Sequence, residues 1–420
     1  MKITILNMSD DTNKGDLAIL AGTIQLSRIR WPAGIIKVIN LDYGREYVGR
    51  ADKFRHLKRL SVEHYGSFFP KVYTGKNRVV DLLNALKNFF ASAAVLLAAG
   101  LFGKYARCLI FGSRRENFSA ISEADLVLLK GGSYIFAFGG FSQLVFLYRV
   151  LFSLMVAITL RKRVVVLGQS IGPLKGRPAK FLARAGLERC EKIILREDIS
   201  YNYLVDKLRV SPDRLEIWPD LAFWSPDGPK KLSASSSRRP EKIGFTFRDW
   251  QFPEEQSARR RDELLENYLK VMVGLIEDLA RDSREIYVIL HTLSDRAVSE
   301  RIISRLNCRV KYFSRDYSVE ELKSIYSEVD LLIGTRTHSC IFALSVGTPV
   351  IAIAYQKHKG YGIMDMAGQG AYVEDIYGLR EERMMEKIQK VGEEYPRLQR
   401  AVTARVSRLS SEIEEKFSGL

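Results

Sequence analysis

The sequence predicts an α/β protein made of two doubly wound domains, each a parallel sheet covered by helices. Short apolar runs alternate with helical patterns along almost the whole chain, which is the order that βαβ units require. A length of 420 residues exceeds one ordinary core and fits two domains of about 200 residues each. The 46% hydrophobic and 27% charged content is typical of a folded globular protein.

The first domain is expected over residues 1–225. It opens with an apolar strand at 2–7, a polar loop at 8–16 and a helix from Leu17. An apolar and basic insertion is expected near 44–120. The later strands are expected at 35–41, 125–132, 163–172, 191–197 and 215–223, with helical patterns at 179–190 and 199–210 between them.

A linker and a second domain follow. Residues 224–241 are rich in Pro, Ser and charge, so 226–241 is expected to link the domains. The second domain is expected over 242–380, and the chain is polar and helical over 381–420. In the second domain, strands are expected at 242–248, 285–292, 310–314, 331–336 and 349–355, and helices at 255–282, 295–306 and 318–329.

Composition and charge limit which cofactors and binding partners are expected. The four cysteines are widely spread without a CxxC, which argues against a disulfide framework and a structural zinc and fits a reducing cytoplasm. The five histidines lack metal-ligand spacing, so no metal is expected. A net charge of +16 predicts an anionic partner. Nucleic acid is not expected as that partner, because the basic residues are scattered and no recognition motif is present.

Two apolar stretches bear on a membrane. Residues 88–103 carry no charge and are flanked by Lys87 and Lys104. At 16 residues this run falls short of the roughly 20 that span a bilayer, which leaves a buried helix or an interfacial helix. The stretch 141–160 contains Arg149 and reads as a buried helix. We therefore expect a cytoplasmic protein, with peripheral contact to the inner, anionic membrane face as an open alternative.

Polar and glycine residues follow the predicted strands in both domains. In open parallel sheets, ligands bind at these carboxyl ends, and glycine lets backbone N–H groups approach an anion there. An Arg at a strand end binds a carboxylate or phosphate, or an internal partner, for which Glu197 or Asp198 is available to Arg196. The candidate residues are Asn13, Gly15, Asp16, Gly131, Gly132, Gln169, Ser170, Arg196, Asp220, Arg248, Arg336, His338 and Tyr355.

Several of these stretches together resemble the polysaccharide pyruvyl transferase family. The most specific pair is RTHSCIFALSVGTPVIAIAY with the HKGYGIM that follows it. The resemblance implies two Rossmann-like domains facing across a cleft (GT-B-like), with an acceptor site in the first, phosphoenolpyruvate in the second, and C-terminal helices packed back on the first. Supporting stretches are NKGDLAIL (13–20), KGGSYI (130–135), GQSIGPLKG (168–176), LREDISYNYL (195–204) and PDLAF (219–223).

The resemblance also implies a reaction and its residues. The enolpyruvyl group of phosphoenolpyruvate would pass to a sugar of a cell-surface or exopolysaccharide precursor as a ketal, with release of phosphate and without a cofactor or metal. Arg196, Arg336 and Lys359 would bind the anionic donor, although Lys357 competes with Lys359 for this position. His338 would be the general acid/base, with Asp16 or Asp220 taking the hydroxyl proton.

Two other functions remain open from the sequence. A GT-B glycosyltransferase using a nucleotide sugar would share the final strand and helix, but the residues after Tyr355 are basic where such enzymes present acidic residues to a ribose. A non-enzymatic membrane-surface scaffold would not require Arg336 and His338 at a strand end. The acceptor sugar and the oligomeric state do not follow from the sequence.

Overall fold

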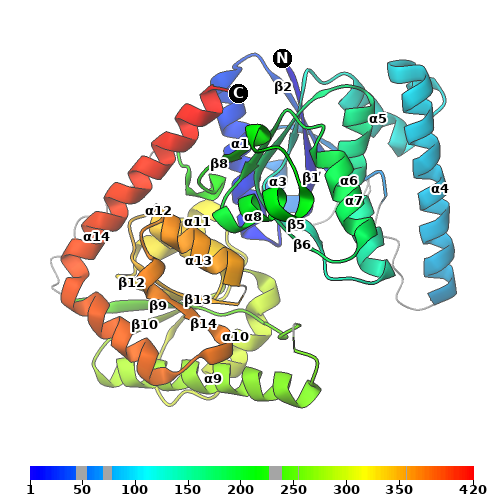
Figure 1. The fold of residues 1–420 in the computed structure, drawn as a ribbon. Helices are drawn as coiled ribbons and strands as arrows, with labels where there is room; N and C mark the ends of the chain where they lie inside the picture. Colours follow the sequence, from blue (N-terminus) through cyan, green and yellow to red (C-terminus); the bar gives the residue numbers. More distant parts are fainter. Residues whose placement is uncertain (44–53, 70–77, 227–238, 254, 356) are drawn as a thin grey trace. The chain divides into compact units, whose positions relative to one another are not determined.

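The computed structural model describes residues 1–420 except 44–53, 70–77, 227–238, 254 and 356 (Figure 1). The described chain divides into two compact units. The first contains residues 1–11, 19–221 and 417–420, and the second contains 12–18 together with 222–416. Each unit holds one parallel sheet with helices packed on it, which confirms the predicted pair of doubly wound domains. Most of the predicted linker, and parts of the predicted insertion, lie outside the described residues.

The sheet of the first unit has the order β3-β2-β1-β4-β6-β7-β8, with β5 paired to β6. All its strand pairs are parallel, and Ile3 and Ile5 of β1 lie opposite Leu126 and Leu128 of β4. The chain runs outward from β1 to β3 and then resumes on the other side of β1, so the topological switch point lies between β1 and β4. The strands are β1 Lys2–Met8, β2 Ile35–Asn40, β3 Glu63–Tyr65, β4 Leu126–Leu129, β5 Gly132–Ala137, β6 Arg163–Leu174, β7 Lys192–Leu195 and β8 Leu215–Ile217.

Helices cover this sheet in layers. Helix α6 packs on β1, β5 and β6, and α4 packs on α6. Helix α1 begins at Lys14, three residues before the predicted start, so the glycine of the predicted loop lies in its first turn. The helices of this part of the chain are α1 Lys14–Arg30, α3 Arg55–Lys58, α4 Arg78–Phe102, η2 Gly103–Cys108, α5 Ser113–Ser122, α6 Phe141–Thr159, α7 Arg177–Leu187 and α8 Asp198–Tyr203.

The sheet of the second unit has the order β11-β10-β9-β12-β13-β14, again with parallel neighbours. Numbered from β9, this is the order 3-2-1-4-5-6 of dinucleotide-binding folds, and its switch point lies between β9 and β12. Every residue of β12 and β13 is buried, as expected of central strands covered on both faces. The strands are β9 Lys242–Thr246, β10 Glu285–Ile289, β11 Lys311–Phe313, β12 Leu331–Gly334, β13 Val350–Ala354 and β14 Val373–Asp375.

The helices of the second unit begin with recognisable caps. Ser257 accepts a hydrogen bond from the Arg260 N–H, and Ser318 forms a capping box with Glu321. The chain ends in one helix of 38 residues, α14, although more than one helix was predicted there. These helices are α9 Ala258–Arg281, α10 Arg296–Ile303, α11 Val319–Ser327, α12 Thr337–Ser345, α13 Lys357–Met366 and α14 Glu381–Ser418.

The first apolar stretch is part of a helix that is longer than the uncharged run itself. It belongs to α4, which has 25 residues because the helix begins at Arg78. By length and composition alone, Leu86–Cys108 and Phe141–Thr159 are both long and apolar enough to cross a bilayer. The second of these stretches is the better buried, since α6 lies directly on the sheet.

Candidate active site

The junction between β12 and α12 positions Arg336 and His338. Strand β12 ends at Gly334, and Arg336 is the N-cap residue of α12. The Thr335 N–H donates to the Thr246 carbonyl at 3.0 Å, and the Ser339 hydroxyl donates to the Arg336 carbonyl at 2.7 Å. These bonds fix the first turn of α12 at the switch point between β9 and β12.

Arg336 is held by a bidentate ion pair with Asp295. Its Nε donates to Oδ2 at 2.5 Å and its Nη2 to Oδ1 at 2.8 Å, while Nη2 also donates to Ser294 Oγ at 3.0 Å. Asp295 accepts further bonds from Thr292 Oγ1 at 3.1 Å and the Asp249 N–H at 3.2 Å. Burial alone would lower the pKa of Arg336, but the hydrogen bonds and charge of Asp295 outweigh it and raise that pKa. The guanidinium is therefore a fixed cation.

The imidazole of His338 rests on the first turn of α1. A Cβ added to Gly15 would lie 2.1 Å from Cγ and Nδ1 of His338, so only glycine fits there. In the same turn, Asn13 Nδ2 donates to Asp16 Oδ2 at 2.7 Å. Lys14 is almost fully buried and pairs with Asp316 Oδ1 at 2.7 Å. The stretch NKGD thus brings a glycine, a carboxylate and a cation to the second unit.

A second histidine, His291, lies in this region after β10. It is buried, and its Nδ1 lies 2.9 Å from the Tyr326 hydroxyl. Among the described residues its Nε2 has no hydrogen-bond partner. Burial lowers the pKa of His291 well below its usual value, and the nearby charges of Arg336, His338 and Lys14 lower it further. His291 is therefore neutral at pH 7, beside the basic side chains of Arg336 and Lys14.

Arg248, which follows β9, packs against two aromatic rings whose centroids are themselves 4.7 Å apart. Its Cζ lies 4.1 Å from the ring centroid of Tyr355 and 5.2 Å from that of Trp250, and its Nη1 donates to the Tyr355 hydroxyl at 3.0 Å. Burial lowers the pKa of Arg248. Lys357 and Lys359 begin α13, but their side chains are outside the described part of the structure.

The first unit holds its own strand-end arginine, Arg196, in a closed ion pair. Nη1 of Arg196 donates to Asp220 Oδ2 at 2.5 Å and Nε donates to Ser170 Oγ at 2.8 Å. Both charged side chains are buried, at 3% and 1% exposed. The expected internal partners were wrong: Glu197 instead caps α8 by accepting the Ser200 N–H at 2.7 Å.

The glycines after β4 serve close packing of the backbone. A Cβ on Gly131 would lie 2.9 Å from the Leu167 carbonyl oxygen, and Gly132 has φ 143°. The Gln169 side-chain amide donates to the Lys130 carbonyl, which ties the ends of β4 and β6 together. Its Oε1 is buried without a hydrogen-bond partner in the described structure.

The sequence-predicted residues thus fall into two groups. Asp295, His291 and Lys14 were not among the predicted site residues, although the first two follow β10 as the strand-end rule would require. Lys14 follows the first strand within a stretch that was predicted as a loop and that forms the first turn of α1. The first unit collects Gly131, Gly132, Gln169, Ser170, Arg196 and Asp220, and the second collects Asn13, Gly15, Asp16, Arg248, Arg336, His338 and Tyr355.

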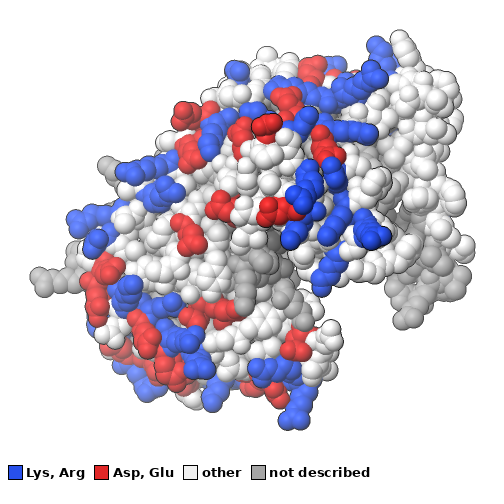
Figure 2. All heavy atoms as spheres, viewed as in Figure 1, with Lys and Arg blue, Asp and Glu red and all other residues white. Residues whose placement is uncertain are grey.

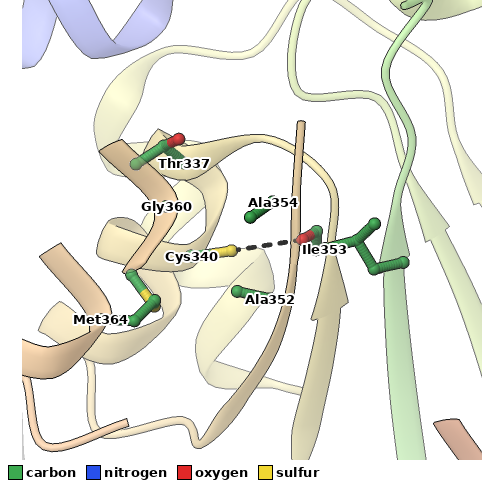
Figure 3. Close-up of a pocket in the computed structure, with 8 residues that line it drawn as sticks. Thr337, Cys340, Ala352, Ile353, Ala354, Gly360 and Met364 are labelled. Atoms are coloured by element: carbon green, nitrogen blue, oxygen red, sulfur yellow. Dashed lines mark hydrogen bonds between the residues drawn. The ribbon is translucent and has the colours of Figure 1, made fainter. Parts of the chain in front are cut away.

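A small cavity lies beneath the start of α12 (Figure 3). Figure 3 shows Cys340 and Met364 pointing into it, with a dashed line from the Cys340 thiol to the Gly334 carbonyl at 3.5 Å. Its volume of about 10 Å³ holds no more than about one water, and its lining is almost wholly apolar. It is a packing gap and is too small for an organic substrate.

No group of three or more His, Cys, Asp or Glu side chains able to hold a metal ion occurs in the part of the chain that the structure describes. The charged groups of the site are instead arginine, lysine and histidine with three carboxylates: Asp295 and Asp316 each pair with a cation, and Asp16 accepts a hydrogen bond from Asn13. Such a donor set favours binding of an anion.

Comparison with known proteins assigns the family. The family model described as polysaccharide pyruvyl transferase matches residues 13–357. The chain belongs to this family. The match begins with the first turn of α1 and runs through the β12–α12 junction to the start of α13, so it includes both strand-end groups.

One curated relative and two solved structures extend this result. The amylovoran biosynthesis protein AmsJ of Erwinia amylovora is 24% identical over 267 residues, which are 60% of this chain and 63% of the relative, just under two thirds of its length. A glycosyltransferase from Rickettsia africae has a TM-score of 0.52 at 11% identity, covering 99% of this chain and 98% of the other. A UDP-GlcNAc 2-epimerase from Neisseria meningitidis has a TM-score of 0.55 at 10% identity, covering 99% of both. These two structures bear out the predicted GT-B-like class of fold.

Proposed function

We propose that this member of the polysaccharide pyruvyl transferase family transfers the enolpyruvyl group of phosphoenolpyruvate to two hydroxyls of a sugar in an exopolysaccharide precursor. The arrangement of Arg336 and His338 carries the proposal. Arg336 is a fixed cation beside the first turn of a helix, and an imidazole lies two residues further on. A small ligand with a carboxylate and a phosphate suits this charge.

The chemistry assigns a role to each residue. His338 protonates C3 of phosphoenolpyruvate, which leaves a cationic C2. The first sugar oxygen bonds to C2 as its proton passes to a carboxylate. The second sugar oxygen then bonds to C2 while the bond from C2 to the phosphate oxygen breaks, and its proton leaves with phosphate. Arg336 and Arg248 stabilise the charge that develops on the leaving group.

Asp16 is the better candidate for the accepting carboxylate. It lies one residue from Gly15, against which the His338 ring packs. Asp220 is buried in the ion pair with Arg196, so its proposed role is to hold that arginine. Arg196 would then bind the anionic part of a substrate only through the guanidinium N–H groups that do not contact Asp220 or Ser170.

A thermal-shift panel tests the donor. Phosphoenolpyruvate, UDP and UDP-glucose are compared on the wild type, on Arg336→Lys and on Arg309→Lys, an exposed arginine that serves as control. We expect phosphoenolpyruvate to stabilise the wild type and the control by about 2.7 kcal/mol at 100 times its Kd, and Arg336→Lys by far less. Stabilisation by the uridine compounds alone would overturn the proposal and favour a nucleotide-sugar glycosyltransferase.

A further inference from the structure

Helix α4 carries an apolar stripe that the first unit leaves uncovered. Its large side chains at spacings of three, four and seven residues fall on one helical face. No charged residue occurs over 88–103, where an exposed helix ordinarily carries several. The stripe consists of Leu83, Leu86, Phe90, Leu97 and Leu101, which are 60%, 41%, 68%, 65% and 68% exposed.

The opposite face of α4 is anchored to α6. Ser92 Oγ lies 2.6 Å from the Tyr148 hydroxyl, and the rings of Phe89 and Tyr148 are 5.6 Å apart. Val95 and Ala99 are buried in the core of the first unit. Because one face is part of the fold, α4 presents a stripe and not a full apolar circumference. This geometry suits a helix that lies along a surface better than one that crosses a bilayer.

The exposure of α4 is specific to that helix. Helix α6 is shorter, at 19 residues, and at least as apolar, yet 44% of its most apolar window is buried, against 22% for the window that starts in α4. Single exposed apolar residues are common on soluble proteins, but a continuous row of large ones marks an interaction surface.

Charge around the stripe indicates what covers it. Lys87, Lys104, Arg107 and Arg115 are exposed near its ends, and no acidic residue occurs between Asp81 and Glu116. Figure 2 shows the described part of α4 that faces the viewer mostly in white. If two copies paired through this stripe, the lysine and arginine side chains of both copies would come close together, and no acidic residue of 82–115 would offset them. An apolar layer beneath anionic headgroups complements both the stripe and its ends.

We propose that α4 docks this protein on an anionic lipid bilayer, with the stripe inserted among the acyl chains and the flanking lysine and arginine side chains on the headgroups. The inference rests on the first unit alone and is independent of the proposed reaction. A failure to bind vesicles would therefore overturn the docking proposal and leave the proposed function unaffected.

Co-sedimentation of the full chain with vesicles tests the docking. Vesicles of phosphatidylcholine with about 30% phosphatidylglycerol are compared with vesicles of phosphatidylcholine alone. We expect binding to the anionic vesicles that is at least about tenfold tighter and that weakens steeply with added salt. Equal binding to both vesicles, or binding that high salt leaves unchanged, would overturn the anionic-surface assignment.

Matched variants locate the surface. Leu97→Asn with Leu101→Asn removes the C-terminal end of the stripe. The control Ile29→Asn changes another exposed apolar residue of the same unit, 54% exposed and outside α4. We expect the pair to abolish vesicle binding and Ile29→Asn to leave it within about twofold. Lys104→Glu with Arg107→Glu should weaken binding about tenfold or more, and Lys58→Glu with Arg59→Glu should not. A wild type that ignores vesicles, and whose dimer the Leu97 and Leu101 substitutions disrupt, would make α4 an interface between copies and overturn the proposal.

Discussion

The two units place an arginine at the end of a buried strand in two different ways. Arg196 is enclosed with Asp220 and Ser170, and both members of that ion pair are almost inaccessible. Arg336 also has an aspartate partner, but its side chain remains 15% exposed, and the charges of Arg336, His338 and Lys14 all act on the neighbouring His291. The same fold thus produces a closed pair in one unit and, in the other, a partly exposed pair with further basic side chains beside it. We infer that the second is built to receive an anion.

Substitution of His338, which lies in the cluster of the second unit, should have the largest effect on turnover. We expect His338→Asn to reduce turnover by about 10²–10⁴-fold, because the variant loses the general acid, while phosphoenolpyruvate affinity changes only a few-fold. The measurement is phosphate release from phosphoenolpyruvate with a glycan acceptor, beside calorimetric titration of the donor. Full turnover in His338→Asn would remove the imidazole from the mechanism.

Breaking the closed pair should act mainly on stability. Arg196→Met leaves the buried Asp220 carboxylate without its cation, which should cost about 3–5 kcal/mol in the free energy of unfolding measured with urea. The double variant Arg196→Met with Asp220→Leu should recover much of that loss, because no buried charge remains unpaired. If the single variant is as stable as the wild type, the pair is not closed in solution.

The contact between Gly15 and His338 offers a steric test. In Gly15→Ala the new methyl would meet the imidazole at about 2 Å, so the ring must move. We expect turnover to fall about tenfold or more with the fold retained. Gly392→Ala is the control: a Cβ at Gly392 meets nothing within 4 Å, and alanine in its helix should stabilise by about 0.5–1 kcal/mol. Unchanged turnover in Gly15→Ala would show that the ring is not held against α1.

His291 should make the protein sensitive to mild acid. Its pKa in the folded protein is below its unfolded value near 6.5, so below that pH the unfolded chain binds a proton that the folded chain does not. The folding free energy contributed by neutral His291 is complete above pH 6.5 and falls by up to about 1.4 kcal/mol per pH unit below it. The difference in Tm between pH 7.5 and 5.5 should shrink in His291→Gln. Burial also lowers the pKa of His64, which lies in the first unit, so His64 contributes to the same Tm difference in the wild type. His64→Gln is the control that measures this separate contribution.

The comparison of the two clusters also shows how far sequence reasoning reaches. Alternation of apolar strands and helices predicted both sheets, because central parallel strands such as β12 and β13 are apolar throughout. The strand-end rule selected Arg336 and His338 for the same topological reason. The edge strands β3 and β14 were missed, whereas β8 and β11, which are equally short, were predicted.

Pairing of side chains was the least predictable feature. The partner of Arg196 lies 24 residues away and that of Arg336 lies 41 residues away, so local sequence could not identify either one. The first turn of α1 was taken for a loop because a glycine lies in it, although that glycine is required by the imidazole above it. Such contacts depend on tertiary structure, which no local pattern encodes.

Hydrogen–deuterium exchange of the full chain with phosphoenolpyruvate tests the central claim most directly. We predict that the ligand slows amide exchange over residues 334–340, where β12 meets α12, and that Arg336→Lys abolishes this protection while Arg309→Lys keeps it. UDP should leave the same peptide unchanged. Protection of residues 334–340 by UDP and not by phosphoenolpyruvate would contradict the account.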